Sequence, residues 1–72
     1  MNFKELLAIT RLPSMAKAQL PNVISEKTQK KLLKRSDAEE IIISAIEDIN
    51  HGSIETVENL VLKKMEQGAG EI

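Results

Sequence analysis

Hydrophobic residues recur along the chain at intervals of three and four positions, the spacing of one face of an α-helix. The pattern predicts a first helix over residues 3–12, with an apolar side made of Phe3, Leu6, Leu7 and Thr10. Pro13 ends this helix, because proline disfavours a helical conformation in the residue before it. Ser14 then caps a short turn, and Pro21 closes that turn.

A second helix is predicted from Ser25 to about Arg35, with Ser25 as its N-cap and Glu26 in its first turn. Its two faces differ in chemistry. One face is basic and consists of Lys27, Lys30, Lys31 and Lys34. The opposite face is narrow and consists of Gln29, Leu32 and Leu33. The segment is therefore expected to pack by one side and to present lysines on the other.

The segment SDAEEIIISAIEDINHG, residues 36–52, has the clearest helical pattern. Ser36 and Glu39 have the spacing of a capping box, in which each side chain accepts a backbone N–H of the other residue. Gly52 suits the left-handed position that ends a helix. The apolar stripe between these ends consists of Ala38, Ile41, Ile42, Ala45, Ile46 and Ile49.

The last predicted helix spans residues 53–66, with Ser53 as its N-cap. Its apolar side consists of Ile54, Val57, Leu60, Val61 and Met65. A hairpin is the alternative for this segment. The stretch AIEDINHGSIE, residues 45–55, resembles the helix-then-hairpin opening of the YezD-like proteins, a small bacterial family of unknown function. The resemblance implies that a strand begins at Gly-Ser-Ile-Glu, so helix and hairpin both stay open for residues 53–66.

Two large aliphatic residues, Ile43 and Leu62, fall outside the apolar stripes of their helices. A chain of 72 residues buries only roughly 60% of the surface that its unfolded form exposes. The sequence has one Phe and no Trp, Tyr or Cys, so neither aromatic residues nor disulfides reinforce the core. Small domains of this kind often depend on a partner subunit. We therefore predict a homo-oligomer, with Ile43 and Leu62 as candidate protein-interface residues.

Charge divides the chain into two halves. Residues 1–35 contain eight basic and two acidic residues, a net charge of +6, whereas residues 36–72 contain two basic and nine acidic residues, a net charge of −7. In one interpretation the halves pack together and neutralise each other. In the other they form two surfaces for two kinds of partner.

Residues typical of catalysis are scarce. The sequence has no Cys, no Tyr, no Gly-rich phosphate loop and no GxSxG elbow. Asp48 and His51 have the i, i+3 spacing that di-iron bundles use for a metal, but a solvated turn histidine is the favoured interpretation. We therefore predict a protein that is not an enzyme, with no cofactor, no metal and no small-molecule substrate.

Nucleic acid is the alternative partner, through Lys27, Lys30, Lys31, Lys34 and Arg35. The stretch AKAQLPNVISEKTQKKLLK, residues 16–34, resembles a helix-turn-helix in its rhythm. The stretch IEDINHGSIETVENLVLKKM, residues 46–65, resembles the helix–Gly-turn–helix ends of small bacterial antitoxins, which implies a basic DNA-binding half and a toxin-binding segment.

Together these patterns predict an all-α protein, a small three- to four-helix bundle over residues 1–66 with a disordered tail over residues 67–72. The N-terminal residues resemble neither a secretory signal nor a membrane span, which predicts a cytoplasmic protein that does not bind membranes. The predicted function is non-enzymatic: a protein–protein interaction or regulatory protein that acts through a helical, oligomeric surface. The alternative is a nucleic-acid-binding regulator of the antitoxin or small-repressor kind.

Overall fold

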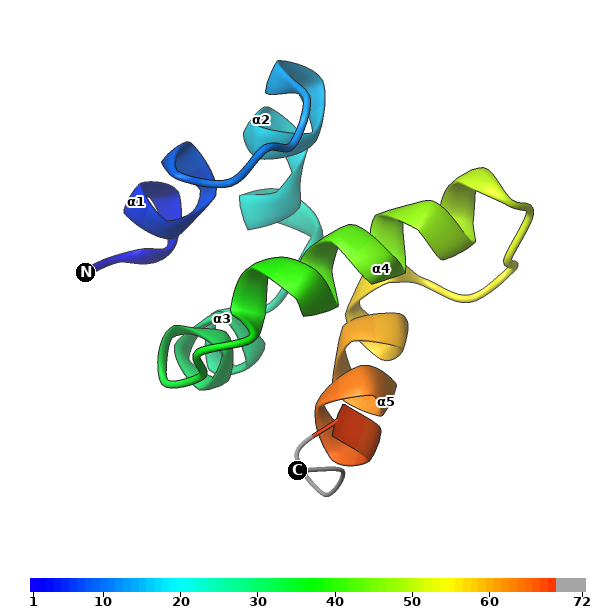
Figure 1. The fold of residues 1–72 in the computed structure, drawn as a ribbon. Helices are drawn as coiled ribbons and strands as arrows, with labels where there is room; N and C mark the ends of the chain where they lie inside the picture. The colour runs from blue at the N-terminus through cyan, green and yellow to red at the C-terminus, as the bar shows by residue number, and fades with distance from the viewer. Residues whose placement is uncertain (69–72) are drawn as a thin grey trace.

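The computed structural model describes residues 1–68, which form five α-helices and no strand (Figure 1). The helices are α1 (Phe3–Ala8), α2 (Ser14–Val23), α3 (Glu26–Leu33), α4 (Ala38–Asn50) and α5 (Val57–Gly68). The predicted all-α class is confirmed, and the hairpin alternative for residues 53–66 is excluded. Helix α5 includes Gln67 and Gly68, the first two residues of the predicted tail. Residues 69–72 lie outside the described part of the chain.

Helix α1 ends at Ala8, four residues earlier than predicted. The side chain of Asn2 caps its start and forms a capping box with Glu5, each backbone N–H donating to the other side chain at 2.8 Å. At the other end the Thr10 hydroxyl donates a 2.7 Å hydrogen bond to the Leu7 carbonyl. This bond satisfies a carbonyl of the last turn, so the helix ends before Pro13 is reached.

Helix α2 differs most from its prediction, because Pro21 lies inside it instead of closing a short turn. Proline removes one N–H donor, but only two helical residues follow Pro21 before the helix ends at Val23. The Ile24 N–H still donates to the Leu20 carbonyl at 3.1 Å. Leu20 and Ile24 are both buried, and their burial offsets the cost of proline in the last turn.

Helix α3 follows α2 after a two-residue turn, and Ser25 caps it as predicted, accepting a 3.4 Å hydrogen bond from the Thr28 N–H. The Gln29 side chain spans the turn, donating to the carbonyls of Ile24 (2.7 Å) and Pro21 (3.1 Å). These bonds attach the first turns of α3 to the end of α2. The Gln29 side chain therefore links the two helices at the turn.

Helix α4 lies at the centre of the fold and runs across Figure 1. The predicted capping box of Ser36 and Glu39 is wrong, because the N-cap residue is Asp37 and no side chain caps the helix. The carboxylate of Glu39 contacts Arg11 instead. The predicted end is confirmed, since Gly52 has a φ of +98°. The N–H groups of Gly52 and Ser53 each donate a 3.0 Å bond back into α4, which completes a Schellman motif.

Helix α5 begins three residues later than the predicted start after Ser53. The hydroxyl of Thr56, instead of Ser53, accepts a hydrogen bond from the Asn59 N–H at 3.1 Å and caps the helix. Ile54, which was predicted to belong to the apolar stripe of this helix, is 99% exposed in the preceding loop. The helical period of residues 54–65 therefore holds only from Val57 onward.

Every helix, together with the α2–α3 turn, contributes to one core. Its largest fully buried side chains are Leu7, Leu20, Ile24, Leu32, Ile42 and Val61. Helix α4 packs mainly on α5, and α1 packs on α2 and α3. Ile43 and Leu62 are half-buried and pack against this core. No helix within residues 1–68 has the length and apolar character needed to cross a bilayer.

Candidate interaction surfaces

An apolar groove lies between α2, α4 and the start of α5, with a volume of about 350 Å³. Its α2 wall consists of Met15, Ala16, Gln19 and Val23. Its α4 wall consists of Ile46, Ile49 and Asn50. Pro13, Leu20 and Val57 complete the lining, so none of the residues that form this α2–α4 groove carries a charge.

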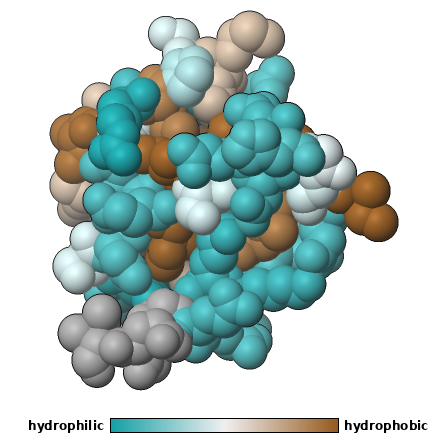
Figure 2. All heavy atoms as spheres, turned by 45° about the vertical axis from the view of Figure 1, so that its right-hand side comes forward, coloured by the Kyte–Doolittle hydropathy of each residue, from teal (hydrophilic) through white to brown (hydrophobic). Residues whose placement is uncertain are grey.

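Two residues of the α2 wall leave much of their side chain exposed to solvent. Met15 is 73% exposed and Val23 is 49% exposed. Opposite them, Ile46 and Ile49 are half-buried. Figure 2 shows a mostly polar face of the molecule on which hydrophobic side chains surface in separate patches. A groove with exposed apolar walls and no charge is suited to an apolar partner surface.

The interface residues predicted from the sequence lie elsewhere. Ile43 packs against the core from α4, and Leu62 packs against it from α5. Leu62 also lines a shallow groove with Lys31, Lys34 and Met65. The interface role of Ile43 and Leu62 stays a prediction, and both side chains already have partners within their own chain.

Sequence reasoning missed Met15 and Val23 because it took residues 14–20 for a short turn. Met15, Gln19 and Val23 follow each other at intervals of four, which is the spacing of one helical stripe. Reading the segment as helical through Pro21 would have exposed this signal. No comparable pattern in the sequence indicates that Ile54 is exposed, because its position fits the helical period of the residues that follow.

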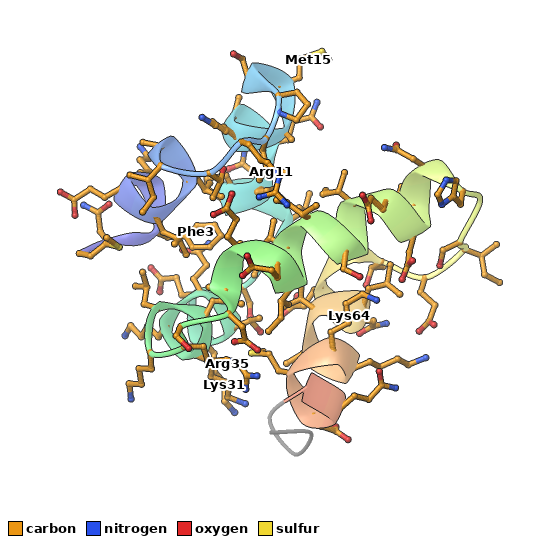
Figure 3. All side chains as sticks on the ribbon, viewed as in Figure 1. Phe3, Arg11, Met15, Lys31, Arg35 and Lys64 are labelled. Carbon is orange, nitrogen blue, oxygen red and sulfur yellow. The ribbon has the colours of Figure 1, made fainter. Side chains whose placement is uncertain are left out.

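The basic stripe of α3 is present as predicted, and we name Lys27, Lys30, Lys31 and Lys34 the lysine face. All four side chains are exposed. Within residues 1–68, none of their ammonium groups lies within 4.0 Å of a carboxylate oxygen. Figure 3 places Lys31 on α3 at the bottom of the view and Met15 on α2 at the top. The lysine face and the α2–α4 groove are thus separate surfaces.

Arg35, which was predicted to bind nucleic acid together with the four lysines, has an internal role. Its guanidinium donates two 2.9 Å hydrogen bonds to the carboxylate of Asp37 and one of 3.3 Å to the carbonyl of Met65. The hydrogen bonds from Arg35 lower the pKa of Asp37 below its ordinary value. Arg35 joins the α3–α4 connection to α5, so its donors are already engaged.

Ion pairs neutralise only some of the charges in the basic and the acidic half of the chain. Between distant segments of the two halves, Arg11 approaches Glu39 at 3.4 Å (Figure 3 labels Arg11). Within the acidic half, Lys63 pairs with Glu55 at 2.6 Å, and Lys64 pairs with Asp48 at 2.8 Å. The carboxylates thus pair with arginines and with the lysines of α5. The lysine face receives no such neutralisation within the described residues.

The start of α3 is occupied by a carboxylate from α5. The hydroxyls of Ser25 and Thr28 donate hydrogen bonds to Oε2 of Glu58 at 2.5 and 2.9 Å. The hydrogen bond from Ser25, followed by the one from Thr28, lowers the pKa of Glu58 below its ordinary value. The positive end of the α3 dipole also favours a negative charge there. The two hydroxyls are therefore engaged inside the chain.

The spacing of Asp48 and His51 does not produce a metal site among the described residues. Asp48 pairs with Lys64, and no group of three or more acidic or histidine side chains within residues 1–68 is placed to hold an ion. No protein-family model matches the chain, and neither curated proteins nor solved structures include a significant match to it.

Proposed function

We propose that the chain is a small non-enzymatic interaction protein of the cytoplasm that binds other proteins through a helical surface, beginning with a second copy of itself. The observation that supports this proposal is the uncharged α2–α4 groove, with Met15 and Val23 exposed on its wall. An exposed apolar groove between two helices is the usual receptor for the apolar face of another helix.

The chemistry of the groove suits a symmetric contact. In a twofold dimer the same patch meets itself, so a charged residue close to the axis approaches its own like-charged copy. The lining of the α2–α4 groove contains no charge, and only Gln19 and Asn50 supply polar side chains. Met15 is an unbranched side chain that adapts to irregular neighbouring surfaces. A second copy therefore meets apolar side chains with no electrostatic penalty.

We place the contact at the groove in preference to Ile43 and Leu62. Both of these side chains are half-buried against the core, so they offer a second copy less new apolar area than Met15 does. Burial of apolar surface stabilises association by about 25 cal/mol per Å² before the entropic cost of binding is subtracted. The most exposed apolar side chains of a groove are therefore the better anchors.

The test is the molar mass in solution, measured by light scattering over a range of protein concentrations. We expect the native chain to be larger than a monomer and Met15→Lys to be monomeric with unchanged helix content. Ile9→Lys is the matched control, because Ile9 is 69% exposed and does not line the groove. A native chain that stays monomeric at every concentration contradicts self-association, and equal effects of Met15→Lys and Ile9→Lys contradict the choice of surface.

A further inference from the structure

We propose that the lysine face of α3 is a second binding site, which takes the phosphate backbone of duplex DNA. Lys27, Lys30, Lys31 and Lys34 follow each other at i, i+3, i+4 and i+7. At a rise of 1.5 Å per residue they span about 10 Å of helix. All four are exposed: Lys27, Lys30 and Lys31 lie within α3, and Lys34 is its C-cap residue. Thr28 and Leu32 anchor the opposite side of the helix in the core.

The grouping of four unpaired charges distinguishes this face from the other cationic side chains within residues 1–68. Arg11, Arg35, Lys63 and Lys64 each have a carboxylate partner, and the ammonium of Lys17 donates to the Ala8 carbonyl at 3.4 Å. Lys4 is exposed without an ion pair, but it is the only basic residue of α1. The lysine face keeps four charges together without a carboxylate in ion-pair range. Two exposed carboxylates flank the face: Glu26 at its N-terminal edge, and Glu66, which lines a groove with Lys31 and Lys34. Four lysines against two carboxylates leave a net positive charge.

The arrangement of α2 and α3 favours a duplex as the partner. The two helices are joined by a two-residue turn and held together by the Gln29 side chain. Helix-turn-helix proteins also place the second of two helices joined by a short turn against DNA, although their turn has about three or four residues. Helix α3 presents its charged side outward from its pair with α2.

Single-stranded nucleic acid fits this surface poorly. Proteins that bind single strands without sequence preference stack the bases on aromatic side chains. The chain has one aromatic residue of the Phe, Tyr and Trp kinds, Phe3, and it is buried with 5% exposure. A duplex needs no stacking partner, because its phosphates face outward.

Contact with the backbone, without base readout, is the mode that these residues support. The hydroxyls of Ser25 and Thr28 are bonded to Glu58, and the guanidinium of Arg35 is bonded to Asp37. Lysine ammonium groups act as point charges on phosphates and carry little sequence information. The binding is therefore independent of sequence and sensitive to salt.

The experiment is a fluorescence anisotropy titration of a labelled duplex of mixed sequence, repeated at increasing salt from low ionic strength. Four phosphate contacts give a slope of log K against log salt of about −3.6, since each contact contributes about −0.9. We expect Lys30→Gln/Lys34→Gln to reduce the slope to about −1.8. Because these side chains are exposed, we expect each variant to fold. Circular dichroism verifies this.

The matched control is Lys17→Gln/Lys63→Gln, which changes the net charge by the same amount at positions on α2 and α5 that do not belong to the lysine face. The control should keep the native slope. Equal losses in both double variants would show attraction by net charge alone and would overturn the proposal. Absence of duplex binding at low salt overturns it as well, and so does binding to phosphatidylserine vesicles that exceeds binding to the duplex. These results leave the α2–α4 groove untouched, because the two sets of residues do not overlap.

Discussion

The isoleucine triplet of α4 allows a comparison of neighbouring side chains that differ mainly in burial. Ile42 is 0% exposed at the centre of the core, whereas Ile43 is half-buried at its edge. Replacing a fully buried isoleucine by alanine costs about 2 to 5 kcal/mol, the sum of lost transfer free energy and the cavity that remains. We expect Ile42→Ala to lower the free energy of unfolding by about 3 kcal/mol and Ile43→Ala by about half as much.

The size of the domain makes this difference large enough to observe. A chain of this length has a free energy of unfolding of about 4 to 11 kcal/mol, so Ile42→Ala removes a substantial share of it. One kcal/mol corresponds to about 4 to 8 °C in melting temperature for a domain of this size. Ile42→Ala should therefore melt about 12 to 24 °C below the native chain.

The assay is urea and thermal unfolding followed by far-UV circular dichroism. All variants are compared at one protein concentration, because self-association adds a concentration-dependent stabilisation. The slope of the unfolding free energy against urea concentration depends on the surface that unfolding exposes. It should stay constant, because each substitution changes that surface by at most one side chain. Equal losses for Ile42→Ala and Ile43→Ala at this concentration would refute the inference that Ile43 lies at the edge of the core of a single chain.

Two further predictions concern Glu58 and Gly52. The pKa of Glu58 is lowered in the folded chain, so its contribution to stability is present above the ordinary carboxylate pKa of about 4.3 and is lost as the pH falls through the lower folded value. We expect urea midpoints of the native chain to fall more steeply in this acidic range than those of Glu58→Gln, with Glu66→Gln as the control that keeps the native steepness. The second prediction concerns Gly52, which has a φ of +98° and no neighbouring atom within 4 Å of the place that a β-carbon would take. Gly52→Ala should therefore lower the free energy of unfolding by about 1 kcal/mol through the backbone alone. Gly52→Asn should cost less, and similar melting temperatures for native and Gly52→Ala would contradict this reasoning.

Local patterns predicted those parts of the fold whose causes are local. The stripe of α4, its end at Gly52 and the N-cap of α3 depend on residues a few positions apart, and all three are present. The capping box at Ser36 failed for a tertiary reason, because Arg11, 28 residues away from Glu39, binds the carboxylate that the box needs. No sequence period reveals that competition.

The two candidate surfaces also differ in whether the local sequence predicts them. A helical wheel is enough to place the lysine face, since exposure of four charged residues follows from their spacing on a helix whose other side is apolar. The α2–α4 groove could not be predicted, because it requires Pro21 to be tolerated in α2 and α2 to approach α4. It is assembled from segments about 30 residues apart, and the positions of Met15 and Ile46 become related only through packing.

The short turn between α2 and α3 has a consequence for how the two surfaces act together. The Gln29 side chain is hydrogen-bonded across this turn, so the groove wall on α2 is linked to the lysines on α3 through a turn of two residues. Two copies joined through their α2 walls would carry two lysine faces in one particle. Such a pair is bivalent, so the second contact with a polyanion occurs at a high effective concentration. Self-association would then increase apparent affinity for the duplex without any change at α3.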